Sequence, residues 1–133
     1  VLVYKVYGRN DMDKAPTEAM EQTSFFNQLS KTHPIIASVA VHIPNEGLRT
    51  MPQVSAMKSR GGYIKGASDI FIPGNPSLLI ELKSRSKKSR ISKDQDLYLN
   101  NAKLLGSMVC VCYGWVAAME AVEEWLSTLN GGG

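Results

Sequence analysis

Three charged residues flank one turn in the middle of the chain. Asp69 opens a short apolar run, Glu81 and Lys83 stand two positions apart in the next run, and residues 74–77 form the turn between them. Two apolar runs about such a turn predict a β-hairpin. Strand side chains alternate between faces, so Glu81 and Lys83 share one face, within reach of Asp69. Two carboxylates and an ammonium gathered there suit the binding of Mg²⁺; the alternative is a surface Glu–Lys pair beside a solvated Asp.

The flanking segments must form the elements that position these residues. The sequence predicts helices over about 16–31, 50–60, 92–105 and 115–129, and strands over 35–43, 69–73, 78–83 and 108–112. Residues 1–7 fit either a strand or a loose extended arm. Helices alternating with strands predict a layered α/β domain with a mixed sheet.

Two further polar side chains fall on the inner faces of predicted helices. On a helical wheel, Glu18 lies in the apolar stripe with Phe25, whereas Glu21 falls about 60° from its centre. Glu18 therefore points toward the core side, unless it lies at a wet, frayed helix end. Gln95 lies on the inner stripe of its own helix, but Ser92-x-x-Gln95 also has the spacing of a capping box, in which Gln95 would bond the Ser92 amide.

Positive charge is concentrated in one part of the chain. The net charge is only +3, yet nine of the fifteen basic residues lie between positions 58 and 93, where only Asp69 and Glu81 oppose them. A local charge of +7 attracts a polyanion without sequence preference. The alternative is a solvated basic loop kept for solubility. The polar run at 84–90 has no core-forming pattern and predicts a mobile loop.

Length and composition fit one globular domain over residues 1–133, with residues 1–14 as an N-terminal arm and 130–133 as a flexible tail. No apolar run approaches the ~20 residues of a membrane span, and no signal peptide is expected. Cys110 and Cys112 alternate with valines in an apolar run. Such neighbours on one strand face make a poor disulfide, so we expect buried, reduced thiols and a cytoplasmic compartment.

In their order, the motifs resemble the virus-type replication-repair nuclease (VRR-NUC) domain of the PD-(D/E)xK nuclease superfamily. An Asp ahead of Glu-x-Lys is a weak signal by itself, but the matching segments together span most of the chain. They are Glu18-x-x-x-Gln22, residues 43–47, 57–61, 66–70 and 80–83, Ser92-x-x-Gln95-x-x-x-Leu99, Gly106 and residues 109–112. One departure is Ser68, where the family usually has Pro. Ser can adopt the extended conformation that Pro favours there.

The resemblance implies a restriction-endonuclease-like layered fold and metal-dependent hydrolysis of DNA phosphodiester bonds. Asp69 and Glu81 would bind Mg²⁺ or Mn²⁺ together with the backbone carbonyl of Leu82, and Glu18 would reach a metal directly or through water. The metal would polarise the scissile phosphate and lower the pKa of an attacking water. Lys83 would orient that water or stabilise the developing charge.

The same resemblance implies further roles. Gln95 matches the family's glutamine that points into the catalytic site. The DNA backbone would be held by basic residues around it, namely Lys58, Arg60, Lys65, Arg85, Lys87, Lys88, Arg90 and Lys93.

Stand-alone domains of this family look like phage-encoded homodimers that act on branched DNA such as four-way (Holliday) junctions. This implies a role in DNA repair, in the host cytoplasm if the protein is phage-encoded, with no membrane or small-molecule cofactor involved. A two-fold dimer suits symmetric cutting of two strands. The alternatives are a monomeric flap or end-directed nuclease, a non-catalytic nucleic-acid-binding module and, more distantly, a scaffold.

Overall fold

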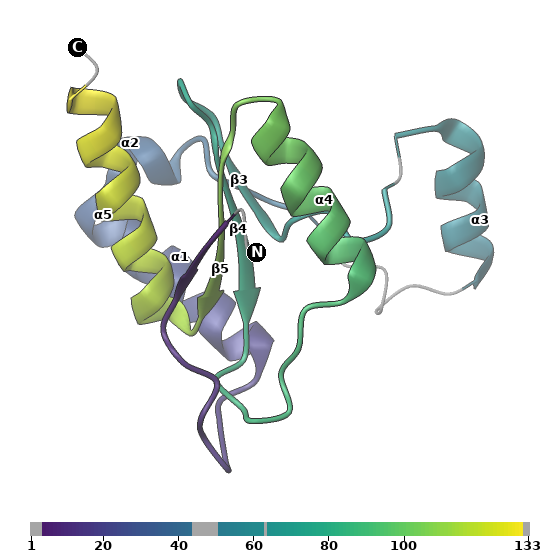
Figure 1. The fold of residues 1–133 in the computed structure, drawn as a ribbon, viewed down its shortest axis with the longest axis horizontal. Helices are drawn as coiled ribbons and strands as arrows, with labels where there is room; N and C mark the ends of the chain where they lie inside the picture. Colours follow the sequence, from purple (N-terminus) through teal and green to yellow (C-terminus); the bar gives the residue numbers. More distant parts are fainter. Residues whose placement is uncertain (1–3, 44–50, 63, 132–133) are drawn as a thin grey trace.

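A mixed five-stranded sheet forms the centre of the protein (Figure 1). The computed structural model describes residues 4–43, 51–62 and 64–131. Along the sheet the strands follow the order β1-β5-β4-β3-β2. Their bounds are β1 Lys5–Tyr7, β2 Val41–His42, β3 Ile70–Ile72, β4 Leu78–Lys83 and β5 Met108–Tyr113. Strands β1, β5 and β4 are parallel, while β3 is antiparallel to β4 and to β2. The predicted hairpin and the predicted mixed sheet are therefore confirmed.

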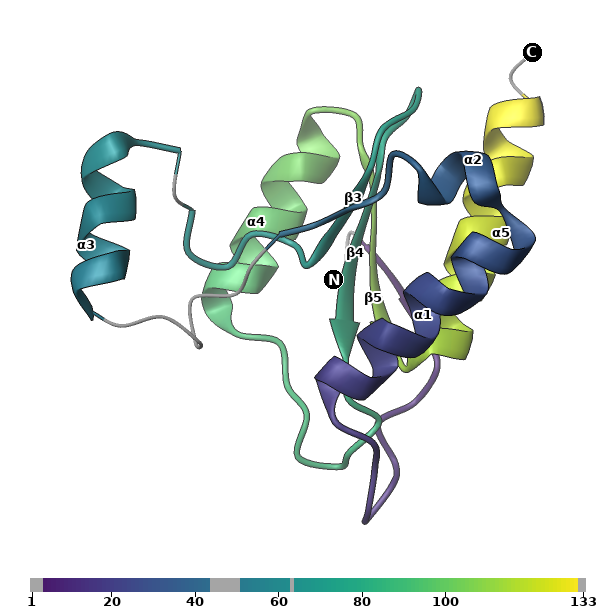
Figure 2. The same ribbon diagram turned by 180° about the vertical axis from the view of Figure 1, so that it is seen from behind.

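Helices cover both faces of the sheet. The bounds are α1 Glu18–Thr32, α2 Pro34–Ala37, α3 Met51–Arg60, α4 Lys93–Leu104 and α5 Trp115–Gly131. Helices α1, α2 and α5 lie on one face and α4 on the other, and α3 stands apart from the sheet in both opposite views (Figures 1 and 2). The layered α/β arrangement agrees with the alternating order of helices and strands in the sequence.

The two faces of β4 supply two cores of different kinds. Ile80 and Leu82 face α1 and α5, where they pack with Phe25 in the larger cluster. Leu79 faces α4 and packs with Leu99 in the smaller one. Alternation along the strand then puts Glu81 and Lys83 on the face opposite to Ile80 and Leu82, so the two share one face as predicted.

The predicted strand over 35–43 is wrong for most of its length. Pro34 begins the short helix α2, and only Val41 and His42 form a strand. A short apolar run does not separate a strand from a buried helical turn by periodicity. Here Pro34 favours the helix, because Pro is common in the first turn of a helix.

The polar run after β4 is held in place at its beginning, contrary to the predicted mobile loop. The amide of Met12 donates to the Arg85 carbonyl at 3.0 Å, and the amide of Lys87 donates to the Met12 carbonyl at 3.0 Å. The Asn10 side chain also donates to the Ser89 carbonyl at 3.1 Å. These bonds connect the run to residues 10–12, and a prediction from local polarity could not include partners more than seventy positions away in the sequence.

The structure also describes most of both ends of the chain and the two cysteines. Lys5–Tyr7 forms a strand, and α5 extends to Gly131. Cys110 and Cys112 are buried free thiols, as expected. Within the described residues, no helix is both long and apolar enough to cross a membrane. Residues 44–47, which contribute to the motif resemblance, lie outside the described part.

Candidate functional site

Asp69 and Glu81 meet because of the hairpin register. Ile70 pairs with Ile80, so Asp69, one residue before β3, stands opposite Glu81. Directly opposed residues on antiparallel strands point their side chains to the same face. The Oδ2 atom of Asp69 accepts a hydrogen bond from the Leu82 amide at 2.8 Å, which fixes the carboxylate against β4.

The two carboxyl groups form a close pair in which Glu81 is buried and Asp69 is half-buried. Burial raises the pKa of both Asp69 and Glu81 above the ordinary carboxyl range, and the neighbouring Asp69 raises the pKa of Glu81 further. When both are ionised, Oε2 of Glu81 is buried with no donor facing it among the described residues. A proton or a cation bound between the two groups would lower the energy of these neighbouring negative charges.

Gln95 makes both of the contacts that the sequence left open. Its Oε1 atom accepts from the Ser92 amide at 2.9 Å, and its backbone amide donates to the Ser92 hydroxyl at 3.1 Å, completing the capping box at the start of α4. Its Nε2 atom donates to Oε1 of Glu81 at 2.7 Å. The two ends of one side-chain amide therefore join the helix cap to the carboxylate pair.

Lys83 ends β4 beside α1. Its side chain is 11% exposed, and its Nζ lies 3.6 Å from Oε2 of Glu18. Glu18 itself is exposed, at 45% of its side chain, at the first position of α1. The structure thus brings Glu18, Asp69, Glu81, Lys83 and Gln95 to one place, with Glu18 facing the lysine.

Glu21 is the acidic residue that the helical wheel discounted. It is 1% exposed, whereas Glu18 is exposed, so the wheel assigned the two in the wrong order. Its carboxylate accepts from Nε of Arg85 at 2.8 Å and from the Trp115 amide at 3.1 Å. The spacing Glu21, Phe25 and Leu29 at i, i+4 and i+8 marks the true buried stripe. A buried Glu on that stripe could have been found only by allowing for a basic partner.

Gly66 explains how the segment before Asp69 approaches α4. Its φ is +85°, and a Cβ atom there would lie 2.5 Å from the backbone carbon of Asp94. A side chain is excluded both by the left-handed backbone and by the space. The loop that carries Asp69 therefore packs directly on the first turn of α4, the turn that also carries Gln95.

The donor set is compatible with a magnesium ion. Within the described residues, no three Asp, Glu, His or Cys side chains are placed to hold a metal together. Mg²⁺, however, is commonly held by one or two carboxylates and completes its shell with water and substrate phosphate. The unpartnered oxygen of Glu81, beside Asp69, fits such a site. The Leu82 carbonyl supports it, because a strand residue directs its N–H and C=O to the same neighbour, and the Leu82 N–H points to Asp69.

The basic residues expected to bind DNA differ in their exposure, and several take part in ion pairs or hydrogen bonds within the protein. Lys65 lies 3.5 Å from Asp94, Lys87 lies 2.8 Å from Asp13, and Arg85 is paired with Glu21. The Nη1 atom of Arg90 donates to two backbone carbonyls of its own loop. The remaining members, Lys58, Arg60, Lys88 and Lys93, are exposed.

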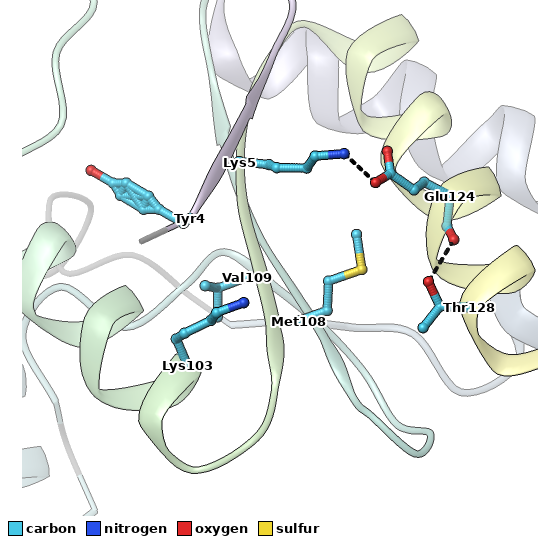
Figure 3. Close-up of a pocket in the computed structure, with 7 residues that line it drawn as sticks. All are labelled: Tyr4, Lys5, Lys103, Met108, Val109, Glu124 and Thr128. Carbon is cyan, nitrogen blue, oxygen red and sulfur yellow. Dashed lines mark hydrogen bonds and ion pairs between the residues drawn. The ribbon is translucent and has the colours of Figure 1, made fainter. Parts of the chain in front are cut away.

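Two pockets are lined by residues other than the carboxylate pair. One of about 340 Å³ lies where β1 and β5 approach α5, and Figure 3 shows the Lys5–Glu124 ion pair at its side. Glu124 also accepts from the Tyr7 hydroxyl at 2.7 Å. The other, of about 250 Å³, is lined by Ile64, Leu97 and Leu105 among others. Neither contains a carboxylate pair of the kind formed by Asp69 and Glu81.

Comparison with known proteins bears on the fold. The structure is similar to that of a solved VRR_NUC domain protein, with a TM-score of 0.70 and 20% sequence identity, over 86% of this chain and 91% of that chain. No family model and no curated protein matches the sequence. The likeness confirms the predicted VRR-NUC fold, an α/β layered architecture with a central mixed sheet.

Proposed function

We propose that this protein is a metal-dependent DNA endonuclease that hydrolyses phosphodiester bonds, with Mg²⁺ or Mn²⁺ as its cofactor. The observation that carries the proposal is the buried Asp69–Glu81 pair, which keeps one oxygen without a donor while Lys83 follows two residues later on the same strand face. Like charges are buried together at a cost that a bound cation offsets.

Asp69 and Glu81, with the Leu82 carbonyl, would hold the metal. When bound, the metal supplies Lewis-acid polarisation of the phosphate and eases deprotonation of a water. Gln95 holds one oxygen of Glu81, and the other has no hydrogen-bond donor among the described residues. Leu82 fixes the opposite carboxylate through its amide.

Lys83 and Glu18 act at the edge of this pair. The Lys83 ammonium is nearly buried, so its charge is weakly screened and can stabilise negative charge developing on a phosphate oxygen or orient the attacking water. Glu18 lies against that ammonium and limits its rotation. A further role for Glu18 toward the metal, through water, belongs to the same proposal.

The DNA backbone would contact basic groups on both sides of the site. Lys88, Arg90 and Lys93 are exposed where β4 leads into α4, and Lys58 and Arg60 are exposed on α3, which stands out from the body (Figure 2). Lys65 and Lys87 would join them if their ion pairs opened. Contacts of this kind position the duplex without reading its sequence.

The preferred substrate would be branched DNA such as a four-way junction, cut by a homodimer in DNA repair, in the cytoplasm of the cell or of a phage host. A two-fold pair of sites matches two symmetric cuts. The dimer interface would include the exposed apolar side chains on and directly after α4, namely Leu97, Leu104 and Leu105. The alternative within the class is a monomer that cuts flaps or ends.

The test compares labelled four-way junction, flap and linear duplex DNA, each with Mg²⁺, Mn²⁺ or EDTA. Paired symmetric nicks in the junction support the dimeric enzyme, and cuts near a single end support the monomeric alternative. Binding without cleavage of any substrate in either metal would sink the nuclease proposal and leave a nucleic-acid-binding module.

A further inference from the structure

The buried carboxylate of Glu21 joins three parts of the chain. It extends from α1, its Oε2 accepts from Nε of Arg85 in the segment after β4, and its Oε1 accepts from the amide of Trp115 at the start of α5. A carboxylate at a helix N-terminus also meets unsatisfied amides and the positive end of the helix dipole. Both oxygens are thus used within the protein, and at 1% exposure Glu21 is out of reach of DNA.

The side chain of Arg85 packs against Gly114, whose backbone is hydrogen-bonded to the end of β4. A Cβ atom on Gly114 would come within 2.8 Å of Cδ of Arg85, so the arginine stem lies directly against this glycine. The amide of Gly114 in turn donates to the Lys83 carbonyl at 3.0 Å. The backbone of Lys83 is therefore held by the turn that Arg85 covers.

The same carboxylate sets the position of Glu18. Residues three apart on a helix are neighbours on its surface, one turn from each other. Fixing Glu21 to Arg85 and Trp115 therefore fixes the rotation of α1 at the turn where Glu18 faces Nζ of Lys83. One ion pair, buried at its Glu21 end, thus supports both the backbone of Lys83 and the group that faces its ammonium.

We propose that Glu21 and Arg85 form a positioning pair for Lys83. The inference rests on the proposed nuclease function, and it assigns Arg85 a role within the protein in place of a DNA contact. Neither residue touches the reacting atoms. Their effect is to keep the Lys83 ammonium at a fixed place beside the Asp69–Glu81 pair.

The test uses Glu21→Gln, Arg85→Lys and the double variant Glu21→Gln/Arg85→Lys. Single-turnover cleavage is measured with protein in excess, and DNA affinity is measured separately in EDTA. We expect cleavage to fall about 10-fold to 100-fold, the effect of a small misplacement in a catalytic group. DNA affinity should stay within about 3-fold of wild type, because no phosphate contact is removed. The double variant should be no slower than the slower single variant, since both changes act on the same contact.

Glu124→Gln is the matched control. Glu124 also joins a helix to distant groups, Lys5 and Tyr7, but its helix α5 lies on the opposite face of the sheet from α4, which carries Gln95 (Figure 1). It should cleave at the wild-type rate. If the Glu21 and Arg85 variants melt at the temperature of Glu124→Gln and still cut as fast as wild type, the inference is wrong. The inference is equally wrong if Arg85→Lys loses DNA affinity and keeps its maximal rate, because Arg85 then contacts DNA and does not position Lys83.

A readout without catalysis separates this inference from the proposed function. The NMR signal of the Lys83 ε-methylene group should shift in Glu21→Gln, although Glu21 does not contact Lys83, and should stay in place in Glu124→Gln. Wild-type protein that cuts no DNA defeats the nuclease proposal alone. An unchanged Lys83 signal in folded Glu21→Gln defeats the positioning pair alone. If Glu21→Gln does not fold, the same two measurements are made on Arg85→Lys, which keeps a positive charge beside the buried Glu21.

Discussion

The side chain of Gln95 donates a hydrogen bond from Nε2 to Oε1 of Glu81 over 2.7 Å, while its other end caps α4. One residue thus transmits the position of a helix N-terminus to the buried carboxylate pair. Because the two contacts use different atoms of the amide, substitutions can separate the structural contribution of Gln95 from its contribution to the site.

Gln95→Ala removes both contacts, and Ser92→Ala removes only the hydroxyl that accepts from the Gln95 amide. Each should lower the free energy of unfolding by about 1 kcal/mol, the usual value of a cap. Only Gln95→Ala should slow cleavage, because Ser92→Ala leaves the bond to Glu81 intact. Urea unfolding and single-turnover cleavage measure the two effects. Equal losses of cleavage in the two variants would mean that Gln95 acts only through the helix cap.

Asp69→Asn should abolish metal binding at the carboxylate pair. The amide keeps an oxygen toward the Leu82 amide but loses the charge that draws a cation, so Mg²⁺ affinity should fall about 100-fold or more. Calorimetric titration with Mg²⁺ measures this, and DNA binding in EDTA serves as the control. Lys83→Ala should leave Mg²⁺ affinity nearly unchanged and still stop cleavage. Normal cleavage by either variant contradicts the assignment of the site.

Stability of the metal-free protein should fall with rising pH. Burial raises the pKa of Asp69 and Glu81, so the folded state holds protons that the unfolded state releases. The stability from these groups is complete below the ordinary carboxyl pKa and is lost as pH rises through the raised values. In EDTA, the melting temperature should therefore be lower at about pH 8 than at about pH 6. Glu81→Gln should flatten this slope.

Mg²⁺ should reverse that trend. Metal binding must displace the proton held by the carboxylate pair, so affinity should rise with pH by up to about tenfold per unit for each proton released. Titrations in buffers of different ionisation enthalpy count the released protons directly. Proton release of zero across this range would show that the pair is already ionised without metal.

Exposed basic residues should contribute to DNA affinity one by one. Lys88→Gln and Lys93→Gln each remove a charge that has no ion pair within the described residues. Each should weaken binding to all DNA sequences alike and reduce the slope of log affinity against log salt by about 1. Lys5→Gln, at the far pocket, is the control. Fluorescence anisotropy over a salt series checks the slopes.

The sequence predicts the centre of the site because local rules determine it. Strand alternation and a hairpin turn are enough to bring Asp69 opposite Glu81 with Lys83 on the same face. The capping spacing of Ser92 and Gln95 is likewise local. The short helix α2 was missed, since an apolar run of that length is ambiguous before its packing is known.

The residues that hold the site in position could not be predicted from strand alternation, turns and helix caps. Glu21 is polar on a buried stripe, and its burial depends on Arg85, which lies 64 positions away in the sequence. In the same way, the sequence alone predicts that Lys65, Lys87 and Arg85 are available to bind DNA. In the folded protein each is paired with an acidic residue: Asp94, Asp13 and Glu21, respectively. Local charge predicts a basic face; only tertiary structure shows which of its cations remain available.

Ser68, at the position where the resembling family has Pro, carries a stability cost. It is fully buried, and its hydroxyl has no hydrogen-bond partner in the described part of the chain. A buried hydroxyl without a partner is unfavourable relative to its exposed state in the unfolded chain. Ser68→Ala removes that group and only one heavy atom of packing. It should therefore raise the free energy of unfolding by about 1 kcal/mol.

Ser77→Ala is the matched control for this last prediction. The Ser77 hydroxyl lies 2.8 Å from that of Ser107, so the same substitution there removes a hydrogen bond that is made. It should lower the free energy of unfolding by about 1 kcal/mol, the opposite sign. Urea denaturation of both variants in EDTA gives the comparison without a metal contribution. A loss of stability in Ser68→Ala equal to that in Ser77→Ala would show that the Ser68 hydroxyl has a partner in solution, with a water molecule as the first candidate.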